Sequence, residues 1–142
     1  MMHKIRIQRN IKRIEVNDNG EYIELDFDDL NLPYRYYNMI RSLEHDRAEF
    51  MQELADKIKD KSDSEISEEM IEAERKLNIY FRDKIDEVFG EGTCRKCYGD
   101  ILPSLDMHIQ LFDALTPYFE EEAQRRRSKM NRYSARRTGD AL

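Results

Sequence analysis

The spacing of apolar residues changes at Pro33, and this change constrains the fold more than any other feature of the sequence. Before it, polar and β-branched residues alternate over residues 4–8 and 13–16, and again over 22–27 after a four-residue turn that ends at Gly20. That pattern predicts a β-hairpin, which needs helices or another subunit to cover its apolar face. After Pro33, apolar residues recur every three or four positions, which predicts helices.

The predicted hairpin has one apolar face and one acidic face. We expect Ile14 and Val16 to share a face with the apolar residues of the second strand, which are Ile23, Leu25 and Phe27. Glu24 and Asp26 fall on the opposite face. These carboxylates lack the spacing of a calcium-binding loop, so the sequence favours a solvated polar face over a cation site.

The rest of the chain predicts three to four amphipathic helices. The expected helices cover about residues 33–61, 64–90 and 104–124. Ser64 or Ser67 can cap the second helix, and acidic residues follow in its first turn. Pro117 is expected to kink or interrupt the third helix because it lacks a backbone N–H donor.

A turn rich in glycine and cysteine separates the second and third expected helices. Three of the five glycines, Gly90, Gly92 and Gly99, lie there together with Cys94 and Cys97. We therefore expect an ordered corner. The two-residue gap between the cysteines resembles half of a zinc site, but a structural zinc requires four ligands. The sequence favours a turn that contains thiols, and leaves two alternatives: a metal shared within or between subunits, and a redox pair.

These patterns predict a mainly α chain with an N-terminal β-hairpin, an α+β fold. We assign one domain to residues 1–124, formed by the hairpin (4–28) and a helical body (33–124). Residues 125–142 carry little apolar periodicity and are predicted to be a basic, flexible tail. No apolar run approaches the roughly 20 residues that a membrane span requires, so neither membrane insertion nor secretion is expected.

Charge is strongly segregated along the chain. Charged residues make up 38% of the sequence, and the net charge is −6. Residues 1–13 contain five basic and no acidic residues, and residues 125–137 contain seven basic and no acidic residues. The intervening residues, 14–124, have a net charge of −17. Two cationic ends around an anionic centre favour self-association or docking on an oppositely charged partner.

The sequence contains no pattern typical of a catalytic or cofactor-binding site, so we predict no enzyme activity, no cofactor and no metal. The candidate partner-binding residues are Arg125, Arg126 and Arg127. A basic segment of this kind can contact a protein or nucleic acid, and the acidic centre of the chain favours protein.

Three short motifs resemble the small tail assembly chaperones of long-tailed bacteriophages and related prophages. They are Ile-Asp-Glu-Val-Phe-Gly-Glu-Gly-Thr over 85–93, Tyr-Gly-Asp over 98–100 and Leu-Phe-Asp-Ala-Leu-Thr-Pro-Tyr over 111–118. The resemblance covers about residues 84–122 well and the hairpin loosely, and Cys94 and Cys97 depart from the family pattern. It implies a non-enzymatic, oligomeric protein of the host bacterial cytoplasm, which binds the tape-measure protein and helps recruit tail-tube subunits.

Two other functions fit the same composition. The acidic centre is compatible with an inhibitor that mimics DNA against a host defence nuclease, of the anti-CRISPR type. A structural component of the virion, such as a head–tail connector subunit, is the third interpretation.

Overall fold

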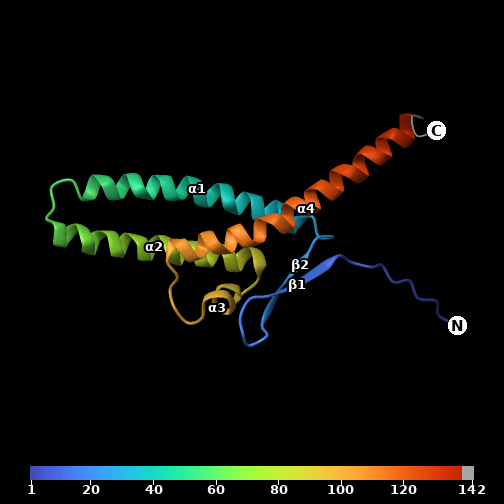
Figure 1. Cartoon of the computed structure of the whole chain (residues 1–142), viewed down its shortest axis with the longest axis horizontal. Helices are drawn as coiled ribbons and strands as arrows, with labels where there is room; N and C mark the ends of the chain where they lie inside the picture. The colour runs from blue at the N-terminus through green and yellow to red at the C-terminus, as the bar shows by residue number, and fades with distance from the viewer. Residues whose placement is uncertain (139–142) are drawn as a thin grey trace. The chain divides into compact units, whose positions relative to one another are not determined.

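The computed structural model describes residues 1–138, which form two β-strands followed by four helices (Figure 1). The chain is therefore mainly α with an N-terminal β-hairpin, as its periodicity predicts. It separates into two compact units, Met1–His108 and Ile109–Leu142. Residue 124, where we placed the end of the domain, lies within the second unit.

The first two elements form an antiparallel hairpin. β1 (Ile11–Glu15) pairs with β2 (Tyr22–Asp26), and Ile14 lies opposite Ile23. The connecting turn contains Gly20 at a φ of 78°, a conformation that glycine adopts without steric cost.

One face of the hairpin is apolar, as predicted. Ile23, Leu25 and Phe27 are buried, and the paired register places Ile14 and Lys12 on their side. The Lys12 ammonium lies 5.9 Å from the centre of the Phe27 ring. β2 also contacts the second helix of the chain, so a helix contributes to the packing of this small sheet.

Residues 4–8 do not form a strand, although they alternate like one. Continuing the hairpin register would pair them with residues 29–33, but a helix already begins at Asn31. Ile5 and Ile7 are consequently 89% and 85% exposed. The prediction for this segment was wrong because alternation alone does not supply a partner strand.

Two long helices form an antiparallel pair, which we call the helical hairpin (Figure 1). α1 (Asn31–Lys57) and α2 (Asp63–Phe89) contact each other. The Tyr80 hydroxyl of α2 donates a hydrogen bond to Asp46 Oδ2 of α1 at 2.6 Å. Near the start of α1, the rings of Tyr36 and Phe89 meet edge to face, with 5.9 Å between their centres. The two helices are thus joined near both the middle and the start of α1.

α2 begins earlier than expected. Its cap is Ser62, whose Oγ accepts a hydrogen bond from the Glu65 backbone N–H at 3.4 Å. Ser64 and Ser67, the predicted caps, both lie inside the helix. The helix ends at Gly90, which has a φ of 112°, as the glycine predicts.

The glycine-rich corner is ordered and contains a short helix, α3 (Thr93–Tyr98), that the sequence did not predict. Asn17 Nδ2 donates a hydrogen bond to the Lys96 carbonyl at 3.0 Å. Lys96 Nζ donates to the Tyr22 carbonyl at 3.4 Å. These bonds connect α3 to the β-hairpin, far away in the sequence.

The last helix, α4 (Leu105–Thr138), is the largest difference from the sequence prediction. It continues through Pro117 without a break. It also includes residues 125–138, which we expected to be a flexible tail, so that part of the prediction was wrong. The final residues of the expected tail, 139–142, lie outside the described residues. Among residues 1–138, no helix is both long and apolar enough to span a membrane.

Candidate functional site

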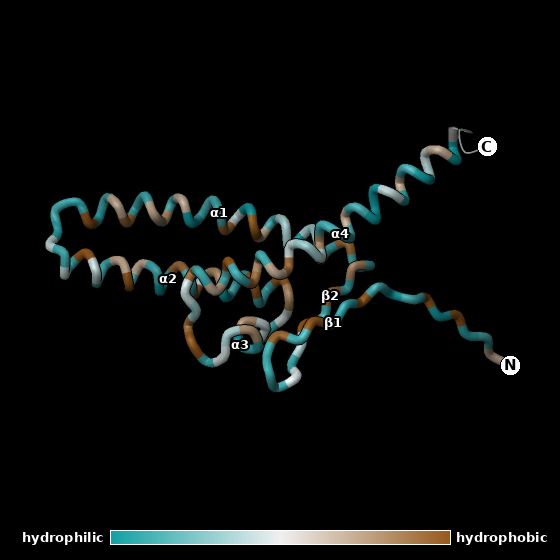
Figure 2. The backbone as a smooth tube through the Cα atoms, viewed as in Figure 1, coloured by the Kyte–Doolittle hydropathy of each residue, from teal (hydrophilic) through white to brown (hydrophobic). Residues whose placement is uncertain are grey.

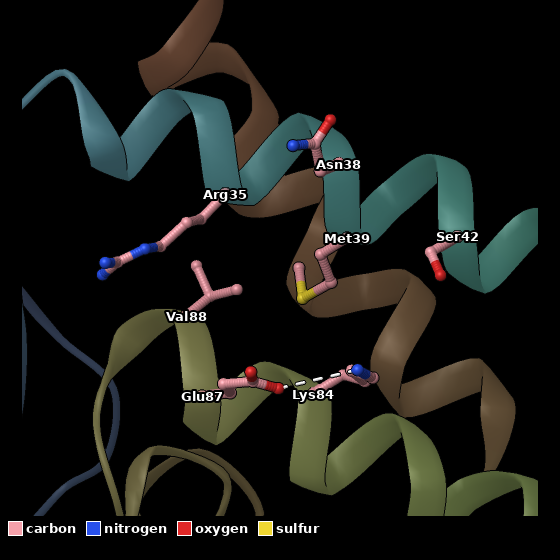
Figure 3. A pocket seen from close by; sticks show the side chains of 7 residues that line it. All are labelled: Arg35, Asn38, Met39, Ser42, Lys84, Glu87 and Val88. Atoms are coloured by element: carbon pink, nitrogen blue, oxygen red, sulfur yellow. Dashed lines mark ion pairs between the residues drawn. The ribbon is translucent and has the colours of Figure 1, made fainter.

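A groove lies between α1 and α2 near the start of α1 (Figure 3). Its volume is about 480 Å³. Met39 of α1 and Val88 of α2 extend into the space between the helices, and polar side chains surround them (Figure 3). The lining residues are Arg35, Asn38, Met39, Ser42, Lys84, Glu87 and Val88. Its one carboxylate, Glu87, pairs with Lys84 at 3.7 Å, so the negative charge in the groove is already paired within α2.

The far half of the helical hairpin exposes apolar side chains. We call residues 47–76 the hairpin end; all of them are described, and Leu54 is the one buried residue among them. Met51, Met70 and Ile71 are 50%, 47% and 66% exposed. Methionine adapts to partners of varied shape, and an exposed apolar helix face commonly accepts another helix. This part of the hairpin is therefore a candidate protein-binding surface.

Met70 lies on a face of α2 that is covered further along the helix. Eleven residues separate it from Phe81, and eleven residues make about three helical turns. Phe81 is 3% exposed and its ring lies 5.7 Å from the ring of His108. The same face of α2 is thus buried near Phe81 and open near Met70.

The hairpin end also carries a block of negative charge, which we call the acidic segment (residues 63–74). It contains six carboxylates and no basic residue. Glu69 pairs with Lys61 at 2.7 Å, and this hydrogen-bonded pair lowers the pKa of Glu69 and raises that of Lys61. Glu72 lies 3.6 Å from Lys76. Glu68 and Glu74 are exposed and form no ion pair with any described residue.

The predicted partner-binding arginines are helical and differ in their surroundings. Arg125 pairs with Glu122 at 3.0 Å, one turn earlier in α4. Arg126 is half-buried and Arg127 is exposed. Arg125 and Arg127 are thus both exposed, and Arg125 already pairs with a carboxylate of its own helix.

The sequence prediction missed a second cationic surface further along α4. Lys129, Arg132, Tyr133 and Arg136 line a pocket of about 270 Å³ on this helix. Met130 and Tyr133 are 66% and 61% exposed, and the end of α4 is otherwise mostly hydrophilic (Figure 2). We call residues 125–137 the basic segment. The helical spacing of these side chains was the missed signal, because the sequence suggested no regular structure here.

The two cysteines sit in a setting that keeps thiols protonated. Burial, followed by the nearby charge of Asp86, raises the pKa of Cys94 and raises that of Cys97 to about 11. The Cys94 thiol donates to the Arg82 carbonyl at 3.6 Å, and the Cys94 backbone N–H donates to Asp86 Oδ1 at 2.9 Å. Thiolates are the species that bind metals and attack disulfides, so this setting disfavours both chemistries.

We expect the purified protein to contain no stoichiometric zinc. A structural zinc requires four ligands, and in the described chain Cys94 and Cys97 belong to no group of three or more closely spaced ligand residues. Elemental analysis of protein purified without chelators checks this prediction. One zinc per chain, lost together with stability in Cys94→Ser, would contradict it.

His108 is a buried histidine held by aromatic neighbours. It is 0% exposed, and its Nδ1 lies 2.9 Å from the Tyr98 hydroxyl. Burial lowers the pKa of His108 to about 4, although the Asn78 carbonyl opposes that shift. Burial also raises the pKa of Tyr98, so the hydroxyl keeps its proton and can donate to the neutral ring. This histidine has a structural role in the packing of α2, α3 and the start of α4.

Other carboxylates that suggested metal sites have identified roles. On the polar face of the β-hairpin, Arg13 pairs with Glu24 at 2.9 Å and Arg9 pairs with Asp26. His45, Asp46 and Glu49 lie within 4.8 Å of one another, a grouping that the sequence analysis did not identify. Asp46 already accepts a hydrogen bond from the Tyr80 hydroxyl, and His45 Nε2 lies 3.4 Å from Glu49 Oε1. A contact between His45 and Glu49 on the surface and a hydrogen bond between the helices account for this cluster.

Comparison with known proteins gives a family. The chain matches DUF6673, a family of unknown function, over residues 19–140. No curated protein and no solved structure matches it. The matched region runs from the turn of the β-hairpin through all of the helices described above. Because it covers most of the sequence, the chain is a member of the DUF6673 family.

Proposed function

We propose that this protein is a non-enzymatic tail assembly chaperone of a bacteriophage or prophage. In this proposal it acts as an oligomer in the cytoplasm of the host bacterium. It binds helices of the tape-measure protein, keeps them soluble and helps recruit tail-tube subunits. The motifs between residues 84 and 122 supply the family resemblance on which the identity of the partner rests.

The observation that best supports this proposal is the exposed apolar surface of the hairpin end. Met51, Met70 and Ile71 lie on two helices that bury Leu54 alone between residues 47 and 76. A tape-measure protein is a long helical client, and it would present many related apolar faces to its chaperone. A methionine-rich helical surface can accept such faces without strict sequence requirements.

The test is the binding of peptides to this surface. Overlapping helical peptides from the tape-measure protein of the same phage or prophage would be titrated into the wild-type protein and into a double variant, Met70→Asp with Ile71→Asp. Some peptides should bind the wild type. The double variant should bind them about tenfold or more weakly, because it places two carboxylates against an apolar face.

A matched control uses Leu30→Asp with Ile101→Asp. These two residues are 68% and 58% exposed and lie outside the hairpin end, so the control should bind as the wild type does. Binding of no peptide at all, or equal loss in both double variants, would contradict a client site on the hairpin end.

The acidic segment favours one alternative, a protein that mimics DNA. Six carboxylates over residues 63–74 without a basic residue form a row of negative charge that can resemble a phosphate backbone. Tight, salt-sensitive, one-to-one binding to a host nuclease would support that function. Charge reversal at Glu68 and Glu74 should then abolish inhibition.

A further inference from the structure

Two helical segments of this chain are complementary to each other in charge and length. The acidic segment, 63–74, has a charge of −6, and the basic segment, 125–137, has a charge of +7. Each has charges of one sign only. At 1.5 Å per residue they extend for about 18 Å and about 20 Å, so one can lie along the whole of the other.

Each segment also exposes a pair of apolar side chains between its charges. On α2, Met70 and Ile71 are 47% and 66% exposed; on α4, Met130 and Tyr133 are 66% and 61% exposed. Glu68 and Glu74 each lie three residues from Ile71. Lys129 and Arg136 lie four and three residues from Tyr133. Because residues three or four apart share a helix face, both segments present an apolar centre with charge on either side.

Several charged side chains of the two segments form no ion pair within the described part of the chain. Glu68 and Glu74 have no ionic partner among the described residues. The same holds within residues 1–138 for Lys129, Arg132 and Arg136, which together with Tyr133 line the 270 Å³ pocket on α4. Both faces are exposed in one copy of the protein, so a second copy can provide the complementary face.

We propose that the basic segment of one copy docks along the acidic segment of a second copy. Met130 and Tyr133 then cover Met70 and Ile71, and the cationic pocket around Tyr133 receives carboxylates such as Glu68 or Glu74. The contact joins two different surfaces, so it is heterologous: two copies can exchange it reciprocally, or many copies can form a chain. This contact requires no client. It covers Met70 and Ile71, so a second copy and the proposed client helix would compete for this surface, and the tests below measure self-association without a client.

Two charge-reversal variants test the contact. One carries Lys129→Glu with Arg136→Glu, and the other carries Glu68→Arg with Glu74→Arg. Each alone should self-associate about tenfold or more weakly than the wild type, because like charges then face each other. Sedimentation velocity over a range of protein concentration measures association, and far-UV circular dichroism verifies that helicity is retained.

An equimolar mixture of the two variants gives the decisive result. The first variant keeps an intact acidic segment, and the second keeps an intact basic segment. Their mixture should therefore restore association in one direction. Restoration shows that the contact is between molecules, whereas a docking of each basic segment within its own chain would give no restoration and would overturn the proposal.

A control separates the surface from the net charge. Lys4→Glu with Arg6→Glu changes the net charge by the same amount as the α4 variant, but in exposed residues before β1. This control should associate more strongly than the α4 variant. Equal weakening by both, a wild type that stays monomeric at low and high salt, or unchanged association of the α4 variant would each overturn the proposal.

Discussion

Acidification from about pH 7 to about pH 4 is expected to destabilise the protein by about 3 kcal/mol through His108 alone. His108 is fully buried, and burial lowers its pKa from 6.5 to about 4. Between these values the unfolded chain binds a proton at His108 and the folded chain does not. The contribution of the neutral ring to stability is therefore complete above about pH 6.5 and is lost as the pH falls toward 4.

Urea unfolding at a series of pH values measures this effect, with His108→Gln as the test variant and His45→Gln as its control. Carboxylates also titrate in this range, so the informative quantity is the difference between the slopes of stability against pH. The slope should become shallower in His108→Gln. His45 is 72% exposed in its side chain, so its replacement tests whether a change of slope is specific to the buried histidine. Equal slopes in wild type and His108→Gln would contradict the prediction.

Replacing Tyr36 with alanine is expected to lower the free energy of unfolding by about 3 to 5 kcal/mol, the usual cost of removing a large buried aromatic side chain. Tyr36 is 1% exposed and its ring contacts Phe89 at 5.9 Å, at the end of α2. The variant leaves a cavity where the first turns of α1 meet the last turn of α2.

Tyr34→Ala is the matched control for this experiment. Tyr34 lies on the same helix and is 68% exposed, so its loss should change stability by no more than about 0.5 kcal/mol. Chemical denaturation of both variants gives the comparison. A similar loss in both would mean that aromatic packing at Tyr36 does not stabilise the joint between the helices.

The sequence predicted those elements whose signals are local. Alternation around Gly20 predicted the β-hairpin and the shared face of Ile14 with Ile23, and the steps of three and four residues after Pro33 predicted α1 and α2. The glycines predicted an ordered corner. In each case the residues that make the structure lie close together in the sequence, so their spacing is sufficient evidence.

The differences arise where the outcome depends on distant residues or on propensity alone. Residues 4–8 have the pattern of a strand but no partner, since α1 begins at Asn31. The end of α4 lacks apolar periodicity, yet residues 118–138 contain no glycine or proline and are rich in arginine and glutamate. These residues favour a helix, and that signal could have corrected the tail prediction.

The candidate site was only partly predictable. Segregation of charge was visible, and it pointed to Arg125, Arg126 and Arg127. The pairing of Arg125 with Glu122, and the surface formed by Lys129, Tyr133 and Arg136, become visible only when this segment is helical. Burial of His108 and Cys94 was also hidden, because it depends on where α3 lies.

The hydrogen bond from Asn17 to the Lys96 carbonyl has a consequence for the order of folding. It joins residues 79 positions apart, whereas the β-hairpin and the helical hairpin are closed by short turns. Local contacts form early because closing a long loop costs more entropy. The β-hairpin is complete once Asp26 has been added. At a synthesis rate of roughly 5 to 20 residues per second, about 3.5 to 14 s then pass before Lys96 is added to the chain. During that interval the surface of the β-hairpin that later contacts α3 is uncovered, and the nascent chain can misassemble through it.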